Sequence, residues 1–234
     1  MNEFSTAVGK ALSMIVSLDA DLVEIVLLSL QISLSAVAIA AIVALPLGAL
    51  IALHDFPGRR GVVILLNALM GLPPVVVGLL VYLLLSRAGP LGPMGLLFTP
   101  TAMVIAQSII VLPIIAALAR QTIADLHEEY DEYLRSLGCT PLQSVSTLLW
   151  DGRFRLLTAL MAGFGRAIAE VGAVIIVGGN IQHSTRVMTT TIALETSKGN
   201  LALALGLGLI LVTLALGVNA TALLVSDAAR RRYG

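Results

Sequence analysis

The chain alternates long apolar runs with short polar connections. Five runs, at roughly 24–53, 61–86, 99–119, 156–178 and 201–225, each reach the length of about 17–25 residues that an α-helix needs to cross a bilayer. Hydrophobic residues make up 58% of the 234 positions and charged residues 12%, against about 25% charged in typical soluble proteins. The pattern therefore predicts an all-α integral membrane protein with five transmembrane helices.

Positive charges are divided unevenly between alternate connections, nine on one side and four on the other. Cytoplasmic connections are enriched in Lys and Arg, so the side with nine is predicted to be cytosolic. This orientation places the N-terminus outside and the C-terminus inside. The nine are Arg59, Arg60, Arg120, Arg135, Arg153, Arg155, Arg230, Arg231 and Arg232; the four are Lys10, Arg87, Arg186 and Lys198.

These features divide the chain into three parts. Residues 1–21 form an N-terminal segment at the outer face, in which we expect a short helix lying on the membrane interface. Residues 22–225 form the transmembrane domain, with a polar cytosolic loop at 120–155, and residues 226–234 form a basic cytosolic tail.

The loop at 120–155 carries the signals of two helices joined at a glycine. Asp125 and Glu128 have the N-cap and N3 spacing of a capping box, and Gly138 suits the left-handed residue that ends a helix. Thr140 as N-cap, followed by Pro141 and by Gln143 three residues on, predicts a second helix. Helical spacing gives the first helix one apolar stripe, formed by Leu126, Tyr130, Tyr133, Leu134 and Leu137.

Two interpretations of this stripe remain open from the residues alone. It can fit the groove of a partner protein, or it can pack on the other helices of the same chain. The single cysteine, Cys139, is expected to be a small apolar residue at the turn, and no metal site is expected anywhere.

Arg166 and Glu170 lie inside the fourth apolar run, where an ionisable group costs several kcal/mol unless it is paired or hydrated. Their i, i+4 spacing predicts that they share a helix face and can pair. Arg166 then either presents positive potential to a passing oxyanion or only joins helices through a salt bridge. In both cases we expect the pair near a subunit interface or gate.

Prolines interrupt the second run at its centre, where residues 71–74 read GLPP. Pro73 and Pro74 remove two backbone donors and disfavour helix at the preceding residues. The half-helix starting near Pro74 would point its positive end into any cavity there, which suits an anion. The alternative is a simple kink, as we also expect at Pro113 and Pro46, whereas Gln107 and Asn219 are expected to join helices by hydrogen bonds.

The connection at 179–200 is too long and polar for a simple turn. Residues 185–197 are predicted to form a short amphipathic helix with Val187, Ile192 and Leu194 inward and Arg186 and Glu195 in water. His183 is expected to be a solvated loop residue and, as a lone histidine, a poor metal ligand. The segment is either an external lid or partner-binding surface, or an ordinary surface loop.

Glu132-Tyr-Leu followed by Gly138 resembles the EAA loop of permease subunits in bacterial ATP-binding-cassette importers. Tyr133 and Leu134 stand in place of two alanines, and residues 148–151 (LLWD) in place of Ile-x-Leu-Pro. The resemblance implies that the loop docks into clefts on separate ATPase subunits. The implied ATPase-coupling residues are Glu132, Tyr133, Leu137, Gly138, Thr140 and Pro141.

Residues 22–225 are similar to the permease domain of the molybdate, tungstate and sulfate importers, and segments 67–92 and 163–199 resemble tungstate-type permeases. The resemblance implies a type I importer fold, a homodimer, two cytosolic ATPases that bind ATP and Mg²⁺, and an oxyanion-binding protein outside. It implies a bacterial or archaeal cytoplasmic membrane, no enzymatic activity, no cofactor on this chain and no nucleic-acid partner. The pathway or gate is assigned to Pro73, Pro74, Arg166, Glu170, Asn180 and Thr189.

Other functions remain open at this point. Molybdate or sulfate is an alternative substrate, and an ATPase-independent carrier using Glu170 is a second class. The chain has no G-x-x-x-x-G-K-[ST] phosphate loop, so ATP, if it drives transport, must bind another polypeptide. A non-transporting anchor protein would leave Arg166, Glu170 and the two prolines without a role.

Overall fold

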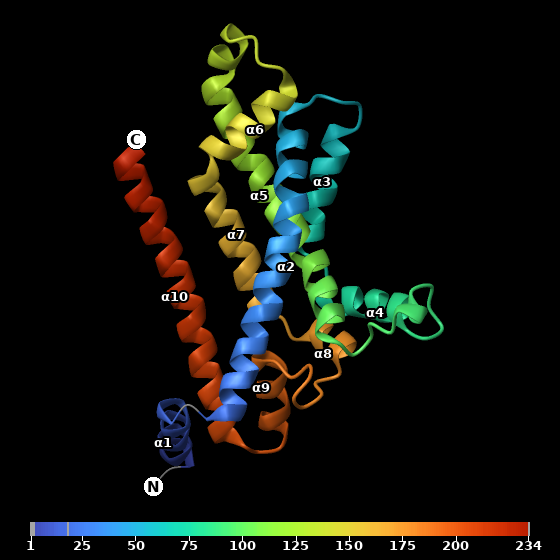
Figure 1. Cartoon of the computed structure of the whole chain (residues 1–234), viewed down its shortest axis with the longest axis vertical. Coiled ribbons are helices and arrows are strands. Elements are labelled where there is room, and N and C mark those ends of the chain that lie inside the picture. The colour runs from blue at the N-terminus through green and yellow to red at the C-terminus, as the bar shows by residue number, and fades with distance from the viewer. Residues whose placement is uncertain (1–2, 18, 234) are drawn as a thin grey trace. The chain divides into compact units, whose positions relative to one another are not determined.

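A computed structural model describes the main chain of residues 3–17 and 19–233; the side chains of residues 3–7, 14, 141–142 and 225–233 lie outside that description. Every regular element in these ranges is helical (Figure 1). The elements are α1 (Glu3–Val16), α2 (Ala20–Leu53), α3 (Arg59–Met70), α4 (Pro74–Leu85), the 3₁₀ turn η1 (Gly92–Met94), α5 (Pro100–Ser136), α6 (Pro141–Asp151), α7 (Arg153–Ile168), α8 (Gly172–Gly178), α9 (Met188–Ser197) and α10 (Leu201–Tyr233).

Three of the described helices, α2, α5 and α10, are long and apolar enough to cross a membrane uninterrupted. The second and fourth predicted spans are each two helices, α3 with α4 and α7 with α8, separated by short breaks. Counting each interrupted pair as one span gives five. The all-helical membrane class is confirmed, and five uninterrupted spans are not found in the described residues.

The N-terminal segment is helical from Glu3 to Val16, as expected. A new helix begins at Ala20 after Asp19, whose Oδ1 accepts hydrogen bonds from the amides of Asp21 and Leu22. This is the N-cap arrangement, which satisfies amides that have no partner within the helix. That α1 lies on the membrane interface stays a prediction.

The chain is organised as two compact units, each assembled from separate stretches. The first contains Met1–Ala36, Pro73–Gln107 and Ala167–Gly217; the second contains Val37–Leu72, Ser108–Arg166 and Val218–Gly234. The long helices α2, α5 and α10 each contribute to both units. The break at residues 71–73 and the one at 169–171 fall near unit boundaries.

In the first unit, α4 packs directly against α8 (Figure 1). A Cβ added at Gly78 of α4 would lie 2.7 Å from the Cα of Ala173, a distance that heavy atoms do not tolerate. Glycine at position 78 therefore permits backbone-to-backbone approach, as small residues do at helix contacts in membranes. Ser29 in α2 adds a polar contact by accepting the amide of Met188 in α9 at 2.8 Å.

In the second unit, apolar side chains of four helices form one core. Ile123 and Leu126 of α5 meet Leu148 of α6, and each of the three is at most 2% exposed. The other buried members are Ala49 and Ala52 of α2, Ala119 and Leu134 of α5, Val145 of α6 and Leu156 of α7. This core fixes α6 against the end of α5.

The polar loop at 120–155 differs from the prediction in its first half. Helix α5 runs without interruption from Pro100 to Ser136, so Asp125 lies inside a helix and not at an N-cap. Glu128 and the neighbouring acids are likewise far from the helix start. The prediction of a separate first helix was wrong because nothing between residues 119 and 136 breaks the main-chain hydrogen-bond ladder.

Candidate functional site

The chain turns sharply between α5 and α6, and we call residues 134–143 the elbow. Gly138 has φ +67°. The amide of Cys139 donates to the carbonyl of Leu134 at 3.1 Å, and the amide of Gly138 donates to that of Arg135 at 3.0 Å. These two bonds form a Schellman motif, and the glycine is required because other residues rarely adopt positive φ.

The second half of the elbow is a complete capping box. Thr140 Oγ1 accepts the amide of Gln143, and Gln143 Oε1 accepts the amide of Thr140 at 2.8 Å. Pro141 occupies the first helical position, where its missing N–H costs nothing. The sequence prediction for this half is confirmed.

The predicted apolar stripe is divided between two environments. Leu126 and Leu134 are buried in the core of the second unit, whereas Tyr133 and Leu137 are 70% and 67% exposed. The stripe lies on one helix, as predicted, but it is covered over only part of its length. Each open interpretation holds for part of it, since some members pack on the chain's own helices and others remain uncovered.

The uncovered members line an open groove of about 570 Å³ between the end of α5 and α6. Trp150, which is 72% exposed, also lines the groove, and Asp151 adds one negative charge. Besides Trp150 and Asp151, the groove is lined by Tyr130, Tyr133, Leu134, Leu137, Ser146, Thr147 and Leu148. Exposed aromatic side chains around an apolar floor are typical of a protein-binding surface.

Two ion pairs and one stacked arginine lie on the helices around the groove. Asp131 Oδ1 lies 2.9 Å from Arg135 Nε, and Glu129 pairs with Arg155 of α7 at 3.4 Å. The guanidinium of Arg153 stacks on Trp150, 4.8 Å from the ring centre, and donates to the Trp150 carbonyl at 2.7 Å. Glu132 is exposed and does not belong to the groove lining.

The two helix breaks meet in the first unit around Glu170. Helix α4 starts at Pro74 with Pro73 as its N-cap residue, as the sequence predicted. A Cβ on Gly172 would lie 2.7 Å from Cγ2 of Val75 and 3.5 Å from Oε1 of Glu170, so the start of α8 touches the start of α4. We call Pro73–Val75 with Glu170–Gly172 the junction.

Glu170 has a structural role in the junction. Its carboxylate is buried, and Oε1 accepts the amide of Ala173 at 3.1 Å in the first turn of α8. Helix α7 ends at Ile168, two residues before Glu170. The expectation that Arg166 and Glu170 share one helix face was therefore wrong, because the helix breaks between them.

Helix α9 contacts the junction through Thr189. Thr189 Oγ1 donates to the main-chain carbonyl of Glu170 at 2.7 Å, and Thr189 is buried. Asn180, at φ +50°, accepts a hydrogen bond from Thr190 Oγ1 at 2.9 Å. Pro73, Pro74, Glu170 and Thr189 are thus close together in the first unit.

Gln107 joins helices as expected. Its Nε2 donates to the carbonyl of Ala167 at 3.0 Å, inside the first unit. That carbonyl lies in the last turn of α7, where carbonyl groups lose their partners within the helix. The bond therefore helps to fix the chain where it enters the break.

The predicted amphipathic helix exists as α9, but one of its faces was assigned wrongly. Val187 is buried as expected, whereas Glu195 is only 6% exposed and Arg186 is half-buried. Glu195 accepts hydrogen bonds from Lys198 Nζ and Asn200 Nδ2, each at 2.9 Å. These bonds, the one from Lys198 first, hold the pKa of the Glu195 carboxyl below its usual value.

Comparison with known proteins now identifies the family. Residues 44–232 match the model of the family described as binding-protein-dependent transport system inner membrane component. The chain belongs to this family. It is thus a membrane transport component, and this agrees with its apolar helices.

Individual relatives support the same family. The transport component is 40% identical over 218 residues to a probable anion ABC transporter permease of Haloferax volcanii, covering 91% of this chain and 94% of the relative. It is 42% identical over 190 residues to a tungstate uptake system permease of Peptoclostridium acidaminophilum, covering 81% and 83%. A sulfate transport system permease of Escherichia coli is 28% identical over 183 residues, covering 75% and 63%.

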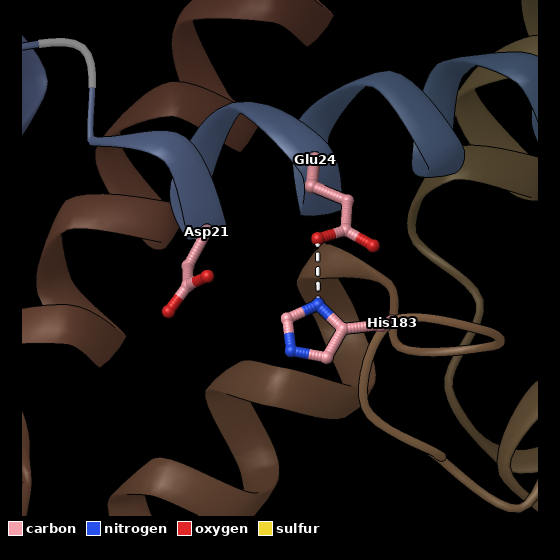
Figure 2. Close-up of side chains that lie close together, drawn as sticks. All are labelled: Asp21, Glu24 and His183. Atoms are coloured by element: carbon pink, nitrogen blue, oxygen red, sulfur yellow. Dashed lines mark hydrogen bonds and ion pairs between the residues drawn. The ribbon is translucent and has the colours of Figure 1, made fainter.

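The sequence did not predict a contact between His183 and Glu24 in the first unit of this transport component. Figure 2 shows His183, from the connection between α8 and α9, against the first turns of α2. Its Nδ1 lies 2.9 Å from Oε2 of Glu24, and Asp21 brings a further carboxylate within 4.8 Å. His183 is exposed as predicted but has a partner, which a separation of 159 residues conceals from pattern analysis.

Proposed function

We propose that this chain is the permease subunit of an ATP-driven importer of tungstate. The observation that carries the proposal is the elbow: a Schellman turn and a capping box hold two helices so that Tyr133, Leu137 and Trp150 remain exposed around one groove. In a family of binding-protein-dependent transport components, such a surface suits a partner ATPase.

The substrate assignment is supported by relatives described as tungstate uptake and anion permeases, at 40–42% identity. The sulfate permeases CysW are matched at only 27–28% identity. Tungstate is therefore favoured over sulfate. Molybdate is the nearest alternative because its tetrahedral dianion has nearly the same size as tungstate, whereas the sulfate dianion is smaller.

The proposed assembly contains two copies of this chain, two cytosolic ATPase subunits that hold ATP and Mg²⁺, and one extracytoplasmic oxyanion-binding protein. The chain spans a bacterial or archaeal cytoplasmic membrane five times, with α3–α4 and α7–α8 counted as one span each. Its N-terminus is outside and the elbow is cytosolic, as the unequal distribution of Lys and Arg indicates.

Transport proceeds by alternating access. When the ATPases bind nucleotide and close, they move the elbow, which they contact at its groove. The end of α5 transmits this movement because the helix is continuous from Pro100 to Ser136. The junction serves as the gate. Irregular main chain at that depth needs protein or water around it, and the amide end of α4 favours an anion.

An ATPase-independent carrier is the competing class, and Glu170 is the acid that it would use for coupling. In the structure, the Glu170 carboxylate caps α8 through the amide of Ala173. A carboxylate that holds the start of α8 in this way has a structural role, which disfavours its use as the coupling acid.

The test is oxyanion uptake into proteoliposomes that contain the complete complex, with the transported metal counted by mass spectrometry. Tungstate should be taken up only when ATP is present on the side of the membrane that carries the ATPase subunits. Excess molybdate should compete with tungstate better than excess sulfate does. Equal uptake of the three anions would remove the tungstate assignment. Uptake without the ATPase would instead favour the carrier.

A further inference from the structure

The second unit has an open recess of about 530 Å³ in which three arginines converge. Arg59 and Arg60 come from the first turn of α3, and Arg120 comes from the middle of α5. The remaining lining residues are Asp55, Val63 and Ile64. Neither the elbow nor the junction uses any of these side chains.

Only one of the three arginines has its charge and donors occupied. Arg59 donates to the carbonyls of Ile51 and Ala52 at the end of α2, each at 2.8 Å, and pairs with Asp55 at 3.0 Å. Among the described residues, the side chains of Arg60 and Arg120 have no hydrogen bond or ion pair. Three positive charges and one negative leave the recess with two unbalanced charges.

The recess lies where two apolar spans end. Arg59 and Arg60 stand immediately before the run GVVILL of α3, and Arg120 follows directly after the apolar part of α5. Positions at the ends of spans lie at the level of the lipid headgroups. Ile64, one turn into α3, is 67% exposed and so presents an apolar wall beside the charged one.

We propose that this recess binds the phosphate headgroup of an anionic phospholipid. Guanidinium groups bind phosphate oxygens through paired, charge-assisted hydrogen bonds, and Arg60 and Arg120 have all their donors available for this. Val63 and Ile64 contact the glycerol and the first part of the acyl chains. Basic pockets between transmembrane helices at a membrane surface are typical sites for such headgroups.

The choice of a lipid over a free anion rests on the apolar wall, which a hydrated inorganic oxyanion would leave in contact with water. The proposal depends on α3 and α5 crossing a membrane. It does not depend on the transported substrate, so loss of the tungstate assignment would leave it unaffected.

The test measures retention of phosphatidylglycerol and phosphatidylcholine on the purified protein by native mass spectrometry after reconstitution in a mixture of the two. The recess variant carries both Arg60→Gln and Arg120→Gln. The control variant carries both Lys10→Gln and Arg87→Gln, which removes two exposed positive charges elsewhere. Because Arg60 and Arg120 have no side-chain partner within the part of the chain that the structure describes, the first variant should keep the thermal midpoint of the wild type.

The expected result is preferential retention of phosphatidylglycerol, reduced about 30-fold in the recess variant, which corresponds to roughly 2 kcal/mol at about 1 kcal/mol for each arginine. The control variant should retain the lipid as the wild type does. Equal retention of both lipids, or equal loss in both variants, would overturn the proposal. Complete displacement of the lipid by millimolar phosphate or tungstate would identify a free-anion site instead.

Discussion

The main-chain amide of Cys139 donates a hydrogen bond to the carbonyl of Leu134 at 3.1 Å, across the left-handed Gly138. The bond closes the last turn of α5, and Thr140 starts α6 one residue later. Cys139 also packs against the core that contains Leu134, as the hydrophobic contact of such motifs requires. The direction of α6 therefore depends on one residue with positive φ.

Gly138→Val should loosen the elbow, since a β-branched residue at φ +67° costs about 1–2 kcal/mol. Amide hydrogen exchange over residues 134–143 should become faster, and Gly138→Asn should restore most of the protection because asparagine tolerates this conformation. Gly95→Val is the matched control, with φ +61° and open space around it but far from the elbow in sequence. Unchanged exchange at the elbow in Gly138→Val would contradict this account.

Thr189→Val should weaken the junction. The valine keeps the volume but leaves the carbonyl of Glu170 without the hydroxyl donor, a loss of about 1–3 kcal/mol for a buried group. Tungstate uptake should fall while ATP hydrolysis by the complex persists, because the elbow is intact. Thr196→Val, an exposed change on the same helix, should leave uptake at the wild-type level; a similar fall in both variants would speak against a specific role of Thr189.

Gly78→Ala should lower the thermal midpoint, because the added methyl would lie 2.7 Å from the Cα of Ala173 and force α4 away from α8. Overpacking of this kind costs about 1–3 kcal/mol. The measurement is thermal unfolding in detergent with Gly165→Ala as the control, a position where an added Cβ meets nothing within 4 Å. Equal midpoints for the two variants would refute the close contact of α4 and α8.

Glu195→Gln should destabilise the protein at neutral pH but not in acid. The Lys198 hydrogen bond lowers the pKa of Glu195 in the folded protein below the ordinary 4.5, so its contribution is present above that value and is lost as the pH falls through the folded-state pKa. The difference in thermal midpoint between wild type and variant should shrink accordingly. A difference that stays constant from neutral pH to well below 4.5 would show that ionisation of Glu195 contributes nothing.

The elbow was predictable because its signals are local. Gly138, Thr140 and Gln143 satisfy main-chain groups within five residues of themselves, and no distant contact is needed. The first half of the polar loop at 120–155, which precedes the elbow, was predicted wrongly because the Asp125–Glu128 spacing also occurs inside helices. A capping box forms only where the preceding residue leaves the helical conformation, and residues 119–125 contain no proline or glycine that would cause this.

The break between α7 and α8 had no such local signal. Residues 169–171 read AEV, without proline, yet helix α7 ends there. The Glu170 carboxylate accepts an amide of the next helix, α8, and the Glu170 carbonyl accepts the hydroxyl of Thr189, nearly twenty residues later. The buried position of Glu195 was missed for a different reason: its partners Lys198 and Asn200 are local, but they follow the helix in a turn, where the amphipathic pattern gives no information. The break at residues 71–73, by contrast, was correctly predicted from two adjacent prolines.

The most direct test of the central claim is cross-linking of the elbow to the ATPase subunit. In a Cys139→Ser background, Leu137→Cys should form a cross-link to the ATPase whose yield changes with ATP, because Leu137 lines the groove and is 67% exposed. Arg135→Cys, two residues earlier and outside the groove lining, should cross-link weakly. Absence of any adduct at position 137, in a complex that still takes up tungstate with ATP, would contradict the proposal that the ATPase drives transport through this elbow.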